Sequence, residues 1–300
     1  MDAPQIDTPP APEPPHEGLS GRRRRRLFPA ARRGKLLLTA AIVIPLLAVW
    51  FDYFHGTGWS QNANPILWYH RMRGEDLYHA DEAYLAHGNR ALPEVALTFD
   101  DGPHPQSRPE ILAVLKTYGV HATFFDVGKN MRSHPELLAQ TLAEGHEIAN
   151  HSDTHRRLDS LSAKERHREI NDADITFFRL TGKHLTLLRP PGMRYNAEVL
   201  GDIRSMGYIT VGYTTASGDF DVTASPEKIA AKTLHWIQNG SILLLHDYPG
   251  TASALPHILD TLKSRGYRCV TVSELLTHLP ARPRTAVEEF VRVQEAAETH

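Results

Sequence analysis

The sequence predicts an α/β fold in which a parallel sheet closes, or nearly closes, into a barrel of the (β/α)7 type. Two observations predict it. Short apolar runs alternate with longer segments of helical periodicity from Val95 onward, and seven strand candidates enclose six helix candidates. A third feature, an apolar segment near the amino terminus, adds a single transmembrane helix before this domain.

The amino-terminal region is expected to carry the membrane anchor. Residues 1–35 form a basic, cytoplasmic tail that we expect to be disordered, and eight basic side chains lie between Arg22 and Lys35. The apolar run 36–51 follows directly and would span ~24 Å as a helix, slightly less than a hydrocarbon core. We therefore expect a single-pass anchor over 36–54 in a bacterial inner (cytoplasmic) membrane, with the large domain on the extracytoplasmic side. The alternative is an export signal that is cleaved, which would also place the domain outside.

The rest of the chain is read as a linker or N-terminal arm over 55–92, a domain over 93–277 and a tail over 278–300. The strand candidates of the domain are 95–99, 122–128, 147–152, 186–190, 209–215, 241–247 and 268–273. The helix candidates are 108–119, 135–146, 162–182, 196–208, 225–240 and 254–267. Ser162 and Ser225 are expected to cap two of these helices, with Glu165 completing a capping box on the first.

Charge and cysteine content exclude several classes of protein. Residues 36–300 hold 25 basic and 31 acidic side chains, so the exported part has no general attraction for nucleic acid. A single cysteine, Cys269, excludes an internal disulfide framework and a cysteine-rich metal site.

Polar side chains gather where four of the predicted strands end. In such barrels the chemistry lies on the loops at the carboxyl ends of the strands, and these ends share one rim. The polar groups in question are Asp100 with Asp101, His151 with His155, Arg189, and His246 with Asp247.

The adjacent carboxylates of Asp100 and Asp101 would repel each other unless a cation compensates one of them. The pattern HSDTH, from His151 to His155, could be two surface histidines. Two imidazoles and one carboxylate would, however, form a divalent metal site with an open coordination position. If Asp101 binds the metal, Asp100 stays ionised and free to accept a proton.

Two further side chains suit this rim. Arg189 lies before two prolines and could be an ordinary surface arginine, but at a strand end it is better explained as a fixed cation that orients a buried carboxylate. His246 ends a very apolar strand; it could be a core histidine, and on this rim it would suit a general acid.

Five short motifs resemble those of a known family. TFDDG (98–102), HSDTH (151–155), RPPG (189–192), SGDF (217–220) and LLLHD (243–247) occur in the order and approximate spacing of the motifs of the polysaccharide deacetylases. This family is also called the NodB homology family or carbohydrate esterase family 4. The resemblance covers about residues 93–277.

The resemblance implies a distorted (β/α) barrel and metal-dependent removal of acetyl groups from N-acetylated sugars. Zinc is the first choice of metal, with cobalt or nickel as alternatives. The roles it implies are the base for Asp100, metal ligation for Asp101, His151 and His155, support of the base for Arg189, and the acid for His246. Asp219, in the fourth motif, is counted with the catalytic residues.

The resemblance also has consequences for the substrate. A backbone N–H of Gly192 or Met193 is expected to hold the oxyanion, and Phe220 and Leu244 are expected to contact sugar. Two positions depart from the usual motifs: Ala216 stands where we align an aspartate of the fourth motif, and Gly192 stands where an aromatic residue is common in the third.

The predicted substrate is an acetylated glycan outside the cell, either peptidoglycan or a polymer of N-acetylglucosamine. Two other functions remain open. The same site could hydrolyse O-acetyl esters or a non-sugar amide, and an impaired relative could bind glycan without turnover.

Overall fold

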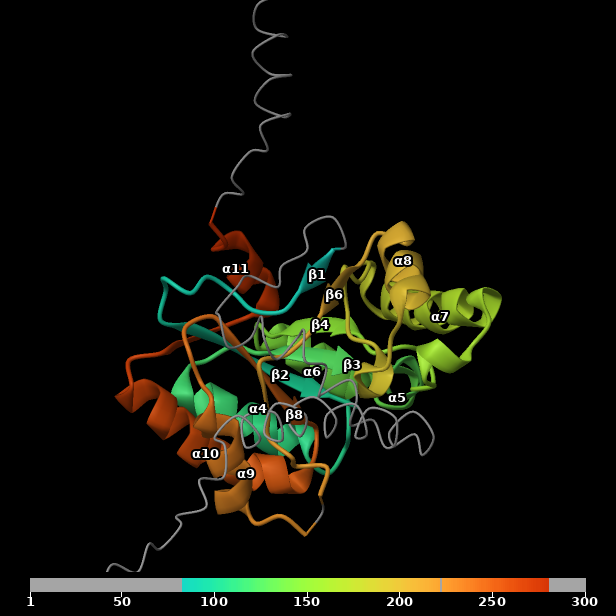
Figure 1. Cartoon of the computed structure of the whole chain (residues 1–300). Helices are drawn as coiled ribbons and strands as arrows, with labels where there is room; N and C mark the ends of the chain where they lie inside the picture. Colours follow the sequence, from blue (N-terminus) through green and yellow to red (C-terminus); the bar gives the residue numbers. More distant parts are fainter. Residues whose placement is uncertain (1–82, 222, 281–300) are drawn as a thin grey trace, which may run out of the picture. The chain divides into compact units, whose positions relative to one another are not determined.

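The structure, a computed structural model, describes residues 83–221 and 223–280 (Figure 1). This part of the chain holds a nine-stranded sheet of order β1-β6-β5-β4-β3-β2-β8-β7, with β9 paired to β2. Every strand pair is parallel. The strands are β1 (Tyr84–Leu85), β2 (Glu94–Asp100), β3 (Thr123–Asp126), β4 (Glu147–Asn150), β5 (Leu187–Leu188), β6 (Ile209–Val211), β7 (Thr215–Ala216), β8 (Ser241–His246) and β9 (Arg268–Val270).

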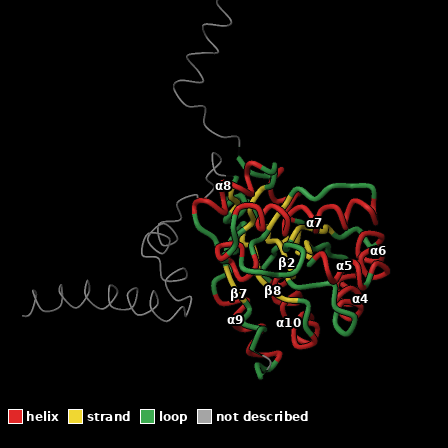
Figure 2. The backbone as a smooth tube through the Cα atoms, turned by 90° about the vertical axis from the view of Figure 1, so that its right-hand side faces the viewer, coloured by secondary structure: helices red, strands yellow, loops and turns green. Residues whose placement is uncertain are grey.

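Helices surround the strands, which lie in the middle of the domain (Figure 2). The helices are α4 (Arg108–Tyr118), α5 (Gly128–Ser133), α6 (Pro135–Ala143), α7 (Ala163–Thr181), α8 (Ala197–Ser205), α9 (Pro226–His235), α10 (Pro249–Ser264) and α11 (Val272–Thr277), with 3-10 turns η2 (Leu158–Ser160) and η3 (Pro191–Met193). The expected anchor over 36–54 lies outside the described residues. Within the described ranges, no helix is long and apolar enough to cross a membrane.

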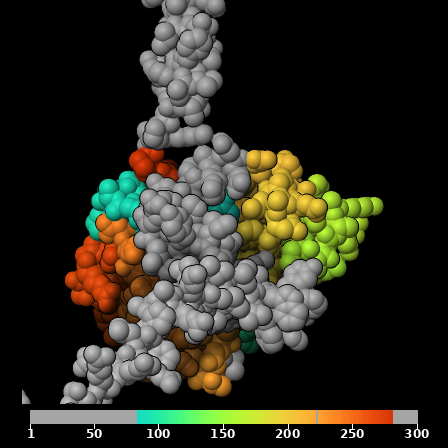
Figure 3. Space-filling model, viewed as in Figure 1, coloured from blue at the N-terminus to red at the C-terminus, as the bar shows by residue number. Residues whose placement is uncertain are grey.

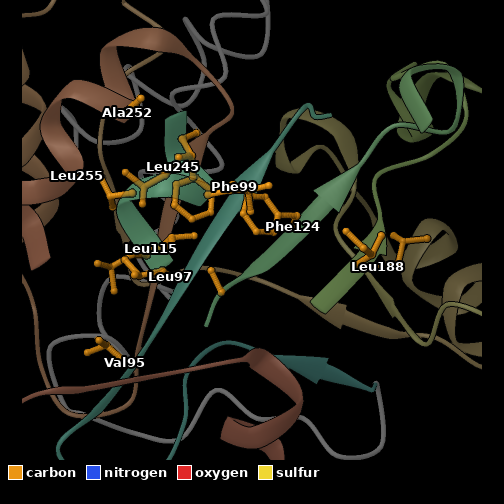
Figure 4. Packing of buried hydrophobic residues seen from close by; sticks show 14 of the residues in the cluster. Val95, Leu97, Phe99, Leu115, Phe124, Leu188, Leu245, Ala252 and Leu255 are labelled. Atoms are coloured by element: carbon orange, nitrogen blue, oxygen red, sulfur yellow. The ribbon is translucent and has the colours of Figure 1, made fainter. Parts of the chain in front are cut away.

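The central strand β2 is buried along its whole length because both faces of the sheet are covered. On its outer face, alternate residues such as Leu97 and Phe99 pack with Leu245 of β8 against Leu115 and Leu255 of helices α4 and α10 (Figure 4). On the inner face, a second apolar cluster joins residues of eight strands and α11. Its members are Leu85, Ala96, Phe125, Ala149, Leu187, Val211, Ile242, Val270, Val272 and Leu275.

That inner cluster shows how far the sheet curls. Leu85 belongs to the strand at one end of the sheet order, and Ile242 to β8 near the other end, yet both lie in one continuous cluster. The parallel α/β fold is therefore confirmed, and its curl fits a (β/α)7 barrel. Among the described strands, β1 and β7 end the sheet order without pairing with each other.

Several element boundaries differ from the predicted ones. The single strand expected over 209–215 is wrong, because the chain leaves the sheet between β6 and β7. At this break the guanidinium of Arg189 donates hydrogen bonds to the carbonyls of Val211 and Gly212. Helix α10 begins at Pro249 instead of residue 254, because proline fits the first turn of a helix, where its missing N–H is not needed.

The helix caps follow the sequence more closely. Ser162 and Glu165 form the expected capping box, and Ser225 caps α9. The first described residues lie beside the last ones (Figure 3), where the Asn89 side chain donates to the carbonyl of His278.

Candidate active site

The parallel sheet brings the polar strand ends together at one rim. Strand β2 ends at Asp100 and is paired along its length with β8, which ends at His246. His151 follows β4, and Arg189 follows β5. The carboxyl ends of parallel strands point the same way, so these four segments meet above the inner apolar cluster.

Asp101, His151 and His155 form a candidate metal site. One ligand atom from each lies within 4.8 Å of the others. The Oδ1 atom of Asp101 lies 3.4 Å from Nε2 of His151 and 3.1 Å from Nε2 of His155. It is buried and has no hydrogen-bond partner within the described residues.

The position of the proton on His151 indicates whether its other ring nitrogen can bind a metal. Its Nδ1 atom lies 2.8 Å from the carbonyl oxygen of Arg189. A carbonyl can only accept, so Nδ1 carries a proton, and in the neutral form of the ring Nε2 presents its lone pair to the carboxylate. A lone pair facing a carboxylate oxygen is repulsive without a cation between them, so the donor set of Asp101, His151 and His155 fits a divalent metal.

The electrostatics at these groups agree with a cation-binding role. Burial alone would raise the pKa of Asp101, but when His151 and His155 carry protons on Nε2, their hydrogen bonds and positive charge outweigh burial and hold the pKa far below the usual range. Positive charge at this place, from protons or from a metal, therefore keeps the carboxylate ionised. The Asp101 carboxylate in turn raises the pKa of His155. Asp101 therefore remains an anion and can act as a ligand at neutral pH.

The loops that carry these ligands adopt left-handed backbone conformations. Asp101, Ser152 and His155 have φ values of 72°, 63° and 61°. Such residues persist only where the surroundings hold them. Asn130 donates to the Asp101 carbonyl, and the Ser152 hydroxyl accepts from the backbone N–H of His155.

Asp100 is held by a buried arginine. Nη1 of Arg189 donates to Oδ1 of Asp100 at 2.7 Å and to the Thr98 hydroxyl at 2.8 Å. The same guanidinium stacks over the ring of Phe125, 4.1 Å from its centre. The second oxygen of Asp100, Oδ2, lies 3.7 Å from Nε2 of His151. One oxygen of Asp100 is thus fixed, and the other points toward the candidate metal site.

His246, the strand neighbour of Asp100, is held by Asp219. Nδ1 of His246 lies 2.7 Å from Oδ1 of Asp219, and Oδ2 of the same carboxylate accepts from the His246 backbone N–H and from the Thr251 hydroxyl. Burial alone would lower the pKa of His246, but the hydrogen bond to Asp219 and the negative charge of Asp100 raise it. Asp219 therefore takes the place beside the histidine, although Ala216 lies in β7 where the family has an aspartate.

The residues expected to contact substrate lie around these groups. Leu244 and His246 alternate along β8 and so share one face of the strand. The Phe220 side chain is 68% exposed, and its ring meets that of His246 edge to face with centres 6.4 Å apart. The Met193 N–H donates to the carbonyl of Pro190, so this amide is already used in a turn and the expected oxyanion role narrows to Gly192.

A second ionic cluster, which the sequence did not reveal, lies beside the loop that follows β2. Arg108 donates to Asp247 through Nε at 2.8 Å and to Asp126 through Nη2 at 2.5 Å, and all three side chains are fully buried. The chain passes very close to this cluster at Gly102, where an added Cβ would lie 2.1 Å from Nη2 of Arg108. Asp126 is the last residue of the buried strand β3, and a carboxylate at the end of a buried strand could have indicated from the sequence that it needs a cationic partner.

Tyr248 is the other residue that sequence reasoning missed. It follows the fifth motif by one position, and its hydroxyl donates to Oδ2 of Asp101 at 2.7 Å. Burial, with Asp101 beside the hydroxyl, raises the pKa of the Tyr248 phenol.

Comparison with known proteins adds an independent observation. A family model described as polysaccharide deacetylase matches residues 87–211. A peptidoglycan-N-acetylglucosamine deacetylase of Bacillus cereus is 39% identical over 190 residues, which cover 61% of this chain and 88% of the relative. The peptidoglycan-N-acetylmuramic acid deacetylase PdaC of Bacillus subtilis is 37% identical over 182 residues, 60% of this chain and 38% of that protein. The chain therefore spans most of the first relative but well under half of the second.

Solved structures share the fold. A family 4 acetyl xylan esterase from Clostridium thermocellum, in complex with a cobalt ion, superposes with a TM-score of 0.59 at 33% identity. The match covers 62% of this chain and 92% of the esterase.

Proposed function

The chain belongs to the polysaccharide deacetylase family, and from that premise we propose that it removes N-acetyl groups from an extracytoplasmic glycan by metal-dependent hydrolysis. Peptidoglycan is the proposed substrate because the similar proteins from Bacillus cereus and Bacillus subtilis are named peptidoglycan deacetylases. The observation that carries the proposal is Oδ1 of Asp101, which accepts no hydrogen bond within the described residues and faces two imidazole nitrogens beside the arginine-held Asp100.

Asp101, His151 and His155 would hold the metal, with zinc as the first choice and cobalt or nickel as alternatives. When bound, the ion supplies a Lewis acid that polarises the acetyl carbonyl and acidifies the attacking water. The carbonyl of Arg189 contributes by fixing the proton of His151 on Nδ1, which keeps Nε2 free as a ligand atom.

Asp100 would be the general base. Its Oδ1 is fixed by Arg189, while Oδ2 faces the metal ligands and can take a proton from the water as attack begins. The ion pair with Arg189 fixes the orientation of the carboxylate beside the metal ligands.

His246 would be the general acid that protonates the leaving nitrogen. Its Nδ1 is bonded to Asp219, so Nε2 is the ring nitrogen that can donate. The raised pKa of His246 increases the fraction that carries this proton near neutral pH.

The sugar and the oxyanion would be held by residues around these groups. The N–H of Gly192 is proposed for the oxyanion, and Phe220 and Leu244 for the walls of the sugar site. The anchor over 36–54 and the extracytoplasmic location stay predictions from the sequence. Protease treatment of intact spheroplasts of the host bacterium, with detection of the domain, tests that orientation.

Product analysis tests the proposed reaction. The purified full-length chain would be incubated with oligomers of N-acetylglucosamine, peptidoglycan fragments and acetylated xylan, in the presence of zinc, cobalt or a chelator. We expect released acetate and a free amine on the N-acetylated substrates, and no product with the chelator.

Two outcomes would replace the proposal by the alternatives. Acetate from the acetylated xylan alone would identify an O-acetyl esterase, which the similarity to the acetyl xylan esterase supports. Stable metal binding without any turnover would identify an impaired relative. The presence of the base, three ligands and acid in one site argues against that second outcome.

A further inference from the structure

Tyr248 lies between the candidate metal site and the candidate acid. It follows β8 and precedes helix α10, and its carbonyl accepts from the backbone N–H groups of Thr251 and Ala252 in the first turn of that helix. Its own N–H donates to the carbonyl of His246. The backbone of Tyr248 is therefore fixed on both sides, which limits where its ring can lie.

The Tyr248 hydroxyl divides the two oxygens of Asp101 between different tasks. It donates to Oδ2 at 2.7 Å, because a carboxylate in this state can only accept. The other oxygen, Oδ1, is left facing Nε2 of His151 and of His155. Asp101 thus presents a single oxygen to the imidazoles.

The aromatic ring of Tyr248 has a separate contact. It stacks on the imidazole of His246, with centres 5.3 Å apart and planes inclined by 10°. This stack covers one face of the histidine, whose Nδ1 is held by Asp219. The hydroxyl and the ring of one side chain therefore contact two different parts of the site, and a change that removes only the hydroxyl can separate their effects.

We propose that Tyr248 is a positioning residue for the metal ligand Asp101, and that its hydroxyl tightens metal binding by fixing the carboxylate with one oxygen toward His151 and His155. This inference rests on the proposed function only in taking these three residues as ligands. Hydrogen bonds to a ligand from the surrounding shell contribute ~10–100-fold to metal affinity in known sites.

The test is the zinc affinity of Tyr248→Phe, measured on the full-length protein by competition with a chromophoric chelator. The variant keeps the ring and its stack on His246 and loses only the hydroxyl. We expect the dissociation constant for zinc to rise ~10–100-fold. Tyr118→Phe is the matched control. The Tyr118 hydroxyl also donates to a carboxylate, that of Asp260, but this bond is exposed and involves none of the candidate ligands. Its zinc affinity should stay unchanged.

Activity at saturating zinc separates positioning from catalysis. If Tyr248 positions the ligand, Tyr248→Phe should recover most of kcat once zinc is saturating. An unchanged zinc dissociation constant with a low kcat at saturating metal would overturn the proposal, because the hydroxyl would then act on the substrate. The visible absorption of the cobalt form provides a second measurement, since loss of the hydroxyl frees Oδ2 and should change the band intensities. Identical cobalt spectra for wild type and variant would also contradict it.

The outcome is independent of the deacetylase activity. A protein that binds zinc with Tyr248-dependent affinity but deacetylates no glycan would refute the proposed function and support this inference. An active deacetylase with unchanged zinc affinity in Tyr248→Phe would do the reverse.

Discussion

Two fully buried arginines lie on opposite faces of strand β3. Arg189 stacks over Phe125 on the inner face, and Arg108 stacks over Phe124 on the outer face. Phe124 and Phe125 are consecutive, and consecutive side chains of a strand point to opposite faces. Both arginines lie at the carboxyl ends of the strands and both bind aspartate, so the two clusters can be compared directly.

The difference lies in how many carboxylate oxygens remain available. Arg108 binds Asp126 and Asp247 together, and Asp247 also accepts from the Ser107 hydroxyl and the His104 N–H. Among the described residues, Arg189 binds one carboxylate and also donates to Thr98 and to backbone carbonyls.

Asp100 therefore keeps one oxygen directed toward the metal site, while both oxygens of Asp247 are bonded. The same type of arginine–aspartate pair thus leaves a carboxylate oxygen available on one face of the strand, and leaves none of Asp247 available on the other.

The largest effect is expected from substitutions in the cluster of Arg189, Asp100 and the candidate metal ligands. Asp100→Asn should lower kcat by ~10²–10⁴, because a general base contributes about that much, while the metal stays bound. His151→Ala should lose the metal as well as activity. Metal content of the purified proteins by mass spectrometry, with deacetylation rates, checks both. Equal metal content in the two inactive variants would contradict the assigned ligands.

The next largest effect breaks the structural cluster. Arg108→Met leaves Asp126 and Asp247 buried without their cation, and the free energy of unfolding should fall by ~3–5 kcal/mol. Urea unfolding of the metal-free protein measures it. Arg156→Met is the control, since its pair with Glu165 is exposed and screened by solvent, so its loss should cost far less stability. Similar losses in both variants would show that the buried cluster has no special structural weight.

A smaller effect is expected on the acid. Asp219 helps to raise the pKa of His246, and activity is lost as pH rises through that pKa because the acid loses its proton. Asp219→Asn removes the charge that helps to raise the pKa of His246, so the alkaline limb of the kcat/KM profile should move to lower pH. Asp221→Asn is the control, because this exposed carboxylate bonds to Thr223 instead. An alkaline limb that stays in place in Asp219→Asn would argue against His246 as the acid.

The smallest effect concerns the sugar. Phe220→Ala should raise KM for the glycan by a few-fold, about 1 kcal/mol, and leave zinc affinity unchanged, because the exposed ring lies beside His246 and touches no metal ligand. Trp236→Ala is the control, since this indole is equally exposed and its recorded ring partner is His235. Steady-state kinetics on one oligosaccharide compares the two variants. An equal rise of KM in both would contradict the assignment of Phe220 to the sugar site.

The sequence predicted the long elements of the fold better than the short ones. Strands β2 and β8 are continuous apolar runs with sharp polar ends, so both their position and their ends could be read. The two-residue strands β1 and β7 are too short to show any periodicity. Helix α5 has the sequence GKNMRS, in which one apolar residue gives no helical pattern.

The candidate site likewise contains residues that could be predicted from the sequence and contacts that could not. Asp100, Asp101, His151 and His246 could be found because each ends or follows a strand, and the topology alone brings strand ends together. Which carboxylate meets which partner could not be read, because that depends on side-chain directions across loops. The contact of Tyr248 with Asp101 and that of Arg108 with Asp126 are of this kind.

The close approach at Gly102 links the two clusters in a way that matters for engineering. Any side chain at this position would collide with Arg108, Asp247 and Asp126, so Gly102 cannot be varied while the buried cluster stays as it is. A library that randomises the loop after Asp101 in search of new metal preferences would therefore yield mostly unfolded clones. Randomising Gly102 together with Arg108, Asp126 and Asp247 would relieve the collision without leaving a buried carboxylate unpaired, and so open this loop to selection.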